Sequence, residues 1–345
     1  MLDRAGNANE FRDSLMAQSA VPAARAPIRV GVVGVGVMGS NHARVLADLP
    51  GASLVGIADP DLMQSRKVAD FLGCKAVANI DDLLALKPDA VIVAAPSHLH
   101  HDIAISAIGA GAHVLVEKPI APTVEEGEAI VAAAKAAGVT LMIGHVERFN
   151  PAVEAIRNAI RGEDILSIGI TRVGPFPPRM SNVGVVIDLA VHDIDLICHF
   201  TDSHIIEVQP QVRAAVADRE DIALLQFRTA NGVLAHINTN WLTPFKARTV
   251  HVATRKKYVI GDLLTRQVTE CSDYKPDGSY SMRHLSVAYA EPLRVELTRF
   301  LDAIRTGGRP DVTGEDGVSS LATAIKCLAE QGSPGDRPAL LRAAG

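Results

Sequence analysis

Short apolar runs alternate with segments of helical periodicity between residues 28 and 145. Continuous apolar runs predict strands that are buried on both faces, as in a parallel sheet. Apolar residues three or four positions apart predict the amphipathic helices between these strands. The expected strands are 28–33, 54–58, 90–95, 114–116 and 141–144, and the expected helices are 40–48, 81–86, 102–109 and 124–137. This alternation predicts an α/β fold that begins with a doubly wound parallel sheet over 28–145.

Beyond residue 146 the pattern shifts toward alternating apolar and polar positions, which predicts half-exposed antiparallel strands. The longest such stretch is 205–260, where Asn231-Gly232 separates two strand-like runs and predicts a hairpin. Helical spacing recurs over 151–161, 184–200, 292–305 and 315–329. We therefore expect a second α/β domain over 146–332, built on a large, mostly antiparallel open sheet.

Composition and charge narrow the class of protein. The net charge of -5 comes without a basic block, which argues against nucleic acid as a partner. No apolar run reaches the roughly 18 residues that span a bilayer, so no membrane segment is expected. The four cysteines form no C-x-x-C pair and indicate reduced thiols in a cytoplasmic protein. Residues 1–27 lack a signal peptide and are expected to form a disordered or extended tail, in which Met16 is an alternative start, and 333–345 a loose one.

The first apolar run leads into the glycine-rich sequence Gly34-Val-Gly36-Val-Met-Gly39. A strand before these glycines and a helix after them predict a dinucleotide site, with the pyrophosphate at the helix N-terminus. The second strand ends at Asp59, where a carboxylate binds ribose hydroxyls and repels a 2'-phosphate, so NAD is favoured over NADP. The residues expected to hold NAD here are Gly34, Gly36, Val37, Met38, Gly39 and Asp59.

A loop rich in histidine follows the strand at 90–95. Three histidines within four residues suggest metal binding, but they lack the helical spacing and the neighbouring Cys or acidic ligands of a metal site. We expect no metal and interpret the loop as a lining for the nicotinamide ribose. The residues assigned to this role are Pro96, Ser97, His98 and His101.

The strand 114–116 delivers Glu117, Lys118 and Pro119 at its carboxyl end. Ligands of doubly wound sheets bind at this end of the strands, so Lys118 is a candidate for chemistry and both Glu117 and Lys118 for cofactor binding. The alternative is a solvated surface lysine before a proline that stops the strand.

The helix expected over 184–200 carries Asp188 and His192 four residues apart, and therefore on one face. A core histidine bound to a neighbouring carboxylate accounts for this spacing without any function. Beside a dinucleotide domain that offers no other base, the pair indicates acid–base chemistry. Asp193 and Asp195 are expected to tie the helix to its surroundings.

Four motifs together resemble those of the Gfo/Idh/MocA oxidoreductase family. They are Gly34-x-Gly36-x-x-Gly39, Glu117-Lys118-Pro119, Gly144-His-Val-Glu-Arg148-Phe-Asn150-Pro151 and Asp188-Leu-Ala-Val-His192-Asp193-Ile-Asp195. The resemblance implies a Rossmann domain, a second domain with a largely antiparallel sheet, and NAD as the cofactor. It also implies that Lys118, Asp188 and His192 are the catalytic set.

Within the family, the third motif and Gly174-Pro-Phe-Pro-Pro-Arg179 are most similar to nucleotide-sugar dehydrogenases. This similarity implies oxidation of a sugar-nucleotide hydroxyl, the 3-hydroxyl of UDP-N-acetylglucosamine in the nearest members. Residues implied in substrate binding are Lys118, Arg148, Asn150, Arg179, Asp188 and His192. Arg179 is equally well explained as an ordinary loop charge, and Lys246 and Arg248 either bind substrate phosphate or contact a neighbouring subunit.

Other functions within the same family stay open on the sequence. A free polyol such as inositol is the main alternative substrate, and an NAD-dependent glycosidase or a non-catalytic NAD-binding regulator are further alternatives. The resemblance also implies a homo-oligomer formed through the second sheet. If the substrate is UDP-N-acetylglucosamine, the 3-keto product would pass to an aminotransferase, for cell-envelope glycolipid such as lipid A.

Overall fold

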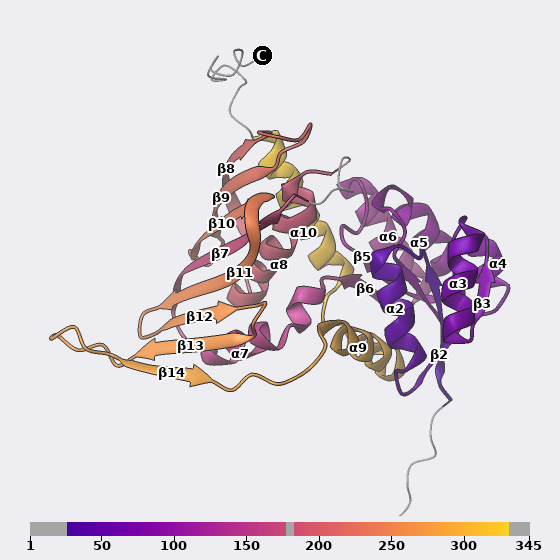
Figure 1. Ribbon diagram of the computed structural model, residues 1–345, viewed down its shortest axis with the longest axis horizontal. Helices are drawn as coiled ribbons and strands as arrows, with labels where there is room; N and C mark the ends of the chain where they lie inside the picture. The colour runs from indigo at the N-terminus through magenta and orange to yellow at the C-terminus, as the bar shows by residue number, and fades with distance from the viewer. Residues whose placement is uncertain (1–25, 177–182, 331–345) are drawn as a thin grey trace, which may run out of the picture.

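The computed structural model describes residues 26–176 and 183–330, which form two sheets with helices packed between and around them (Figure 1). The first sheet has six parallel strands, which confirms the predicted doubly wound parallel sheet, although the helix Leu62–Leu72 and the strand Lys75–Val77 were not among the predicted elements. Its strands are β1 (Ile28–Val33), β2 (Ala52–Ala58), β3 (Lys75–Val77), β4 (Ala90–Val93), β5 (His113–Glu117) and β6 (Leu141–Gly144). Its helices are α2 (Val37–Ala47), α3 (Leu62–Leu72), α4 (Ile80–Leu84), α5 (His100–Gly109) and α6 (Val124–Ala137).

The strand order β3-β2-β1-β4-β5-β6 determines where a ligand binds. The chain runs outward from β1 in one direction and from β4 in the other, so the loops after β1 and β4 diverge at the centre of the sheet. This divergence opens a crevice at the carboxyl ends of the strands. The glycine loop and the histidine loop, which follow β1 and β4, therefore flank one crevice.

The second sheet has eight strands in the order β14-β13-β12-β11-β7-β10-β9-β8. Its strands are β7 (Ile165–Pro175), β8 (Ile205–Arg213), β9 (Ile222–Thr229), β10 (Leu234–Asn240), β11 (Leu242–Thr254), β12 (Tyr258–Asp262), β13 (Gln267–Ser272) and β14 (Ser281–Leu285). The pairing of β10 with β7 is parallel and the other pairings are antiparallel. The predicted hairpin joins β9 and β10 at Gly232, whose φ of 90° suits glycine.

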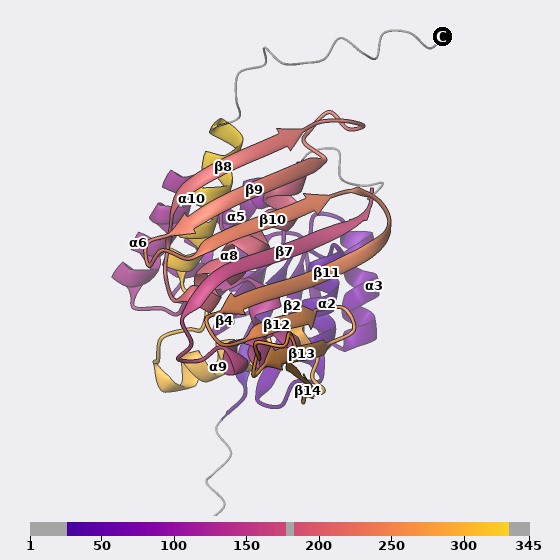
Figure 2. The ribbon, with the colours of Figure 1, turned by 90° about the vertical axis from the view of Figure 1, so that its left-hand side faces the viewer.

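One face of this sheet is turned away from the rest of the molecule (Figure 2). Side chains alternate along β9, so Leu225 and Phe227 are buried against the helices while Leu224 is half exposed. Leu234 on β10 is similarly exposed on its strand. No helix in the described ranges is long and apolar enough to cross a membrane.

The helix that follows β7 is not the single helix predicted over 184–200. A π-helical turn, η3 (Val186–Ala190), precedes the regular helix α8 (Val191–Thr201). A π turn closes i→i+5 hydrogen bonds and so rotates the residues within it relative to an α-helix. Asp188 lies in the π turn and His192 in α8, and the predicted one-turn α-helical spacing between them is therefore wrong.

The C-terminal helices connect the two sheets. Helix α9 (Pro292–Thr306) packs against α2, and its buried residues Leu297 and Phe300 belong to the core of the first sheet. Helix α10 (Gly314–Ala329) contacts both α6 and α8. The chain thus returns to the dinucleotide domain after residue 291, although the pattern had placed all of 146–332 in the second domain. The remaining helix, α7 (Pro151–Ala159), packs on β12 and β13.

Candidate active site

The three glycines of the loop after β1 do different things. Gly34 has a φ of 92°, and a Cβ there would lie 2.7 Å from the backbone of Ala94. A Cβ on Gly39 would lie 1.8 Å from the carbonyl oxygen of Gly34, so helix and loop pack too closely for any side chain. Gly36 faces open space, with nothing within 4 Å of its Cβ position. Gly34 and Gly39 therefore shape the turn, and Gly36 leaves room for a phosphate to approach the backbone.

Helix α2 begins directly at this loop. Gly36 is its N-cap and offers no side chain to its first N–H groups, and no acidic residue stands in its first turn. The amides of Val37 and Met38 are thus available to an anion at the positive end of the helix. These features fit the pyrophosphate of a dinucleotide.

Asp59 lies beside the glycine loop at the end of β2. Its carboxylate accepts the N–H of Val35 at 2.8 Å and that of Asp61 at 2.9 Å, which fixes its position at the rim of the crevice. The side chain is half-buried and keeps free lone pairs for a ribose hydroxyl.

Replacing Asp59 with Ala is expected to weaken NAD binding by about tenfold or more, because a charge-assisted hydrogen bond to the ribose is lost. The same change should improve NADP binding, since repulsion of the 2'-phosphate disappears. Fluorescence titration with both dinucleotides checks this, with the exposed Asp70 changed to Ala as the control. An unchanged ratio of the two dissociation constants would contradict the ribose role.

The histidine loop after β4 contains a short 3-10 turn, η1 (Ser97–Leu99). Pro96 and His98 are exposed and Ser97 is half-buried, so all three are accessible at the crevice, and His101 bonds to Asp102 at 2.8 Å. His100 is buried instead, with its two ring nitrogens 2.8 Å from the carbonyl oxygens of Pro119 and Ala95. It joins this loop to the end of β5.

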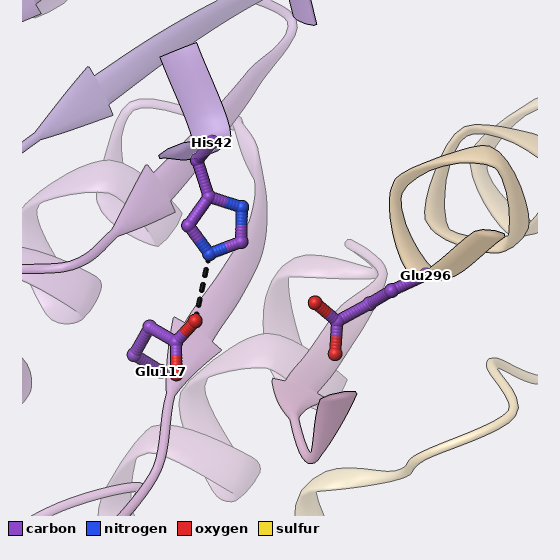
Figure 3. Close-up of side chains that lie close together, drawn as sticks. All are labelled: His42, Glu117 and Glu296. Atoms are coloured by element: carbon purple, nitrogen blue, oxygen red, sulfur yellow. Dashed lines mark hydrogen bonds and ion pairs between the residues drawn. The ribbon is translucent and has the colours of Figure 1, made fainter. Parts of the chain in front are cut away.

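The carboxylate of Glu117 points toward His42 (Figure 3). Its Oε1 lies 2.7 Å from Nε2 of His42 on α2, and its Oε2 accepts the backbone N–H of Lys118. Burial alone would raise the pKa of Glu117, but His42 and Lys118 outweigh burial and lower it. Both oxygens of this carboxylate bind within the protein, so the structure does not support a direct cofactor contact by Glu117. The carboxylate instead holds the backbone of Lys118 in place.

Glu296 of α9 points into the same cluster (Figure 3). Ligand atoms of His42, Glu117 and Glu296 lie within 4.8 Å of one another, a spacing that a metal ion could bridge. A metal-bound histidine normally donates its second N–H to an acceptor, and among the described residues Nδ1 of His42 has none. Burial, with Glu117 nearby, also raises the pKa of Glu296 well above its ordinary value. The cluster is better described as a His42–Glu117 hydrogen bond with a neutral Glu296 beside it, whose two carboxyl oxygens have no partner among the described residues.

The structure brings Lys118 and Asp188 into contact across the two domains. Nζ of Lys118 donates to the carbonyl oxygen of Asp188 at 2.7 Å and to its Oδ1 at 3.0 Å. Both side chains keep some exposure, 17% and 23%, so a ligand can reach them. The π turn that displaces Asp188 from helical register thus presents its carbonyl and carboxylate to the lysine.

His192 stands beside this pair and is half-buried. Its pKa is lowered well below the ordinary value by burial, and further by the charges of Lys118 and Arg172. The imidazole is therefore neutral near neutral pH and can accept a proton. Its ring meets that of His145 edge-on, with centroids 5.8 Å apart. The sequence did not predict this contact. His145 stood there only as part of the motif that begins at Gly144, with no role of its own.

A buried ionic layer fixes α8 against the second sheet. The guanidinium of Arg172 on β7 binds Asp193 at 2.7 Å and Glu147 at 2.9 Å, and Arg248 binds Glu147 at 2.7 Å. Burial would raise the pKa of Glu147, but the two arginines lower it. Removing one partner of such a buried pair costs about 3–5 kcal/mol. The predicted tethering role of Asp193 is confirmed.

The other predicted substrate residues make contacts within the protein. Arg148 binds Asp195 through two hydrogen bonds of 2.6 and 2.7 Å, which confirms that Asp195 ties α8 in place. Asn150 caps α7 and donates to the carbonyl oxygen of Leu263. Arg148 lines a cavity of about 790 Å³ whose wall does not include Lys118. The structure thus gives Arg148 and Asn150 structural roles, and Arg179 lies outside the described residues.

Known proteins share this arrangement. The profile of the Gfo/Idh/MocA oxidoreductase family, with its NAD-binding Rossmann fold, matches residues 28–145, and that of the family's C-terminal domain matches 173–260. UDP-N-acetylglucosamine 3-dehydrogenase of Acidithiobacillus ferrooxidans is 31% identical over 303 residues, 87% of this chain and 96% of the relative. The chain belongs to the Gfo/Idh/MocA family.

Two solved structures and one further relative extend the comparison. The structure of that Acidithiobacillus enzyme has a TM-score of 0.82 and covers 88% of this chain and 97% of its own, at 30% identity. Inositol 2-dehydrogenase 1 of Saccharopolyspora erythraea is 31% identical over 348 residues, 91% of this chain and 98% of the relative. GenD2 from gentamicin A biosynthesis, solved with NAD, is 25% identical with a TM-score of 0.76 over 89% of this chain and 95% of its own. This member of the Gfo/Idh/MocA family is an NAD-dependent dehydrogenase acting on CH–OH groups.

Proposed function

We propose that this dehydrogenase oxidises the 3-hydroxyl of UDP-N-acetylglucosamine to the 3-keto sugar. The observation that carries the proposal is the meeting of Lys118, Asp188 and His192 beside the dinucleotide crevice, in a chain similar to a UDP-N-acetylglucosamine 3-dehydrogenase over nearly its full length. Bound NAD supplies the acceptor for the hydride that leaves the carbon.

The protein's own groups manage the hydroxyl proton. Neutral His192 takes this proton as general base, since its lowered pKa keeps the ring in the base form at neutral pH. Nζ of Lys118 donates a hydrogen bond to the same oxygen as it becomes a carbonyl and stabilises the negative charge that develops there. Asp188 holds Lys118 through its 3.0 Å contact and so positions the ammonium group.

Cationic side chains near His192 support a sugar nucleotide as substrate. Arg248 adds to the low pKa of His192, which places its charge near the base, and its side chain is 35% exposed. Lys246 is exposed on the same strand and packs beside Gly174. Both cationic side chains are suited to a diphosphate. We assign Lys246 and Arg248 to the nucleotide end of the substrate.

Inositol is the second candidate substrate, since an inositol dehydrogenase is as similar to this chain as the sugar-nucleotide enzyme. The two are separated by following NADH absorbance with NAD and either UDP-N-acetylglucosamine or myo-inositol. A glutamate-dependent aminotransferase in a parallel reaction removes the keto product and prevents the oxidation from stalling. NADH from the sugar nucleotide alone is the expected result, and NADH from inositol alone overturns the proposal.

We further propose a cytoplasmic homo-oligomer built on the outward face of the second sheet. That face presents Leu224 and Leu234, half exposed, on adjacent strands that no described helix covers. Replacing Leu224 with Lys should lower the mass measured by light scattering after gel filtration. An unchanged mass would place the interface elsewhere.

A further inference from the structure

The reaction proposed above releases one proton for each hydride transferred, and His192 has to pass that proton on before the next turnover. Its Nδ1 is enclosed by protein and has no hydrogen-bond partner among the described residues. In the proposed reaction its Nε2 takes the proton of the hydroxyl, so bound substrate occupies that side of the ring. An exit through the protein behind the ring would let the proton leave while substrate or product is bound.

His145 occupies the place behind His192. The two rings meet edge-on, with centroids 5.8 Å apart and planes at 83°. His145 is fully buried, and its Nδ1 likewise lacks a hydrogen-bond partner in the described part of the chain. Two neighbouring imidazoles thus each hold an unpaired Nδ1, an unusual arrangement because buried polar atoms are nearly always hydrogen-bonded.

The hydrogen bonds of His145 assign its tautomer. Its Nε2 lies 3.1 Å from Oγ of Ser320, and that hydroxyl donates its own hydrogen to the carbonyl oxygen of Gly317. Nε2 of His145 therefore carries the hydrogen, and its Nδ1 presents a lone pair. A His192 that accepts a proton on Nε2 carries its hydrogen on Nδ1. The two unpaired nitrogens are thus a matched donor and acceptor.

Ser320 leads from His145 to water. It lines the cavity of about 790 Å³, whose wall also includes Asp316, Arg299 and Arg309. The last two are exposed residues, so the cavity reaches the protein surface. Its lining contains none of Lys118, Asp188 and His192, so it opens away from the candidate catalytic groups.

We propose that His145 and Ser320 relay the substrate proton from His192 to this cavity. His192 gains the hydroxyl proton on Nε2 and passes its Nδ1 proton to Nδ1 of His145, once a small ring rotation brings the two nitrogens together. His145 gives its Nε2 proton to the Ser320 hydroxyl, whose hydrogen leaves to cavity water. After product release, water in the crevice takes the proton on Nε2 of His192, and the reverse transfers from cavity water through Ser320 and His145 return the hydrogens to Nε2 of His145 and Nδ1 of His192. One proton enters the chain and one leaves, with no change of oxidation state.

Both rings of the relay are neutral in the resting enzyme. Burial lowers the pKa of His145, as it lowers that of His192, with Asp195 opposing and Arg148 adding to the effect at His145. Neither imidazolium is a stable resting place, so a proton moves on to water. The simple alternative is that His145 only fills the core between α8 and α10.

The relay rests on the proposed dehydrogenase reaction, and single-turnover kinetics separate the two. In weak buffer, NADH absorbance and a pH-indicator dye follow hydride transfer and proton release on mixing the NAD-loaded enzyme with UDP-N-acetylglucosamine or myo-inositol. The variants are His145→Phe and Ser320→Ala, with Ser319→Ala as the matched control, because Ser319 is an exposed neighbour on the same helix wall.

We expect His145→Phe and Ser320→Ala to slow proton release and kcat by about tenfold or more at unchanged KM, with a larger solvent deuterium isotope effect. Small imidazole buffers should restore part of the rate, which a merely structural role does not predict. Normal proton release and isotope effect in both variants overturn the relay. If His145→Phe does not fold, Ser320→Ala decides alone.

Nitrogen-15 NMR of the imidazoles provides a test that needs no turnover. The relay requires hydrogen on Nδ1 of His192 and on Nε2 of His145 in the resting enzyme. Finding hydrogen on Nδ1 of His145 overturns it. If neither alcohol yields NADH, the substrate proposal fails, while this measurement still decides the relay.

Discussion

Replacing His192 with Asn is expected to lower kcat by about 10²–10⁴-fold near neutral pH, because the general base is removed. NAD binding should be nearly unchanged, since the dinucleotide contacts predicted here come from loops after β1, β2 and β4. Steady-state NADH formation gives kcat, and fluorescence titration gives the dissociation constant of NAD. The result separates a catalytic histidine from a core histidine, which would alter stability more than rate.

The pH profile of the wild-type enzyme tests the same assignment. Burial and neighbouring cations lower the pKa of His192 below 6.5, so its base form persists into mildly acid solution. The acid limb of kcat/KM should therefore fall below pH 6.5.

The control for the His192→Asn variant is His199→Asn, because His199 lies on the same helix with a pKa lowered to about 4. A kcat of the His192→Asn enzyme within twofold of the control would remove His192 from the mechanism.

Much of the first domain could be predicted because its signals are local. Buried strands require unbroken apolar runs, and the turn after β1 requires glycine where a Cβ on Gly39 would collide with Gly34. The Asn231-Gly232 turn likewise specifies its own hairpin. Lys118 could be placed at the ligand-binding end of the first sheet because the carboxyl ends of its parallel strands all lie on one side.

The contacts that assemble the site are not local, and the sequence could not supply them. The π turn at Asp188 begins where the N–H groups of Val185 and Val186 donate to Glu220, a tertiary contact that helical periodicity does not reveal. Arg148 has the chemistry of a phosphate ligand, but Asp195 on α8 binds its guanidinium. His145 meets His192 because the 3-10 turn η2 (Val146–Phe149), which follows His145, packs against α8, and no spacing rule links the two positions.

The packing of α9 against the core of the first sheet is also a non-local contact that the sequence could not reveal. Its apolar residues show helical spacing, which predicts a helix but not the surface that it covers. The structure places Phe300 in the dinucleotide core and Glu296 against the Glu117 that precedes Lys118. The end of β5 is thus supported by a helix from nearly the other end of the chain.

Replacing Lys118 with Met is expected to lower kcat by about 10²–10³-fold, because the donor that stabilises charge on the reacting oxygen is lost. Methionine keeps the length and apolar stem of lysine, so the packing at the end of β5 should persist. The effect should appear in kcat more than in the dissociation constant of NAD, because Nζ points to Asp188 on the substrate side. Stopped-flow NADH formation measures the step directly.

The matched control is Lys135→Met, which removes an exposed ammonium on α6 whose partner is Glu315. This variant should retain the wild-type rate, since a surface ion pair contributes only about 0–1 kcal/mol. The opposite pattern for Lys118→Met, a weak NAD complex with a normal single-turnover rate at saturation, would make Lys118 a cofactor ligand alone. In that case another group would stabilise the reacting oxygen.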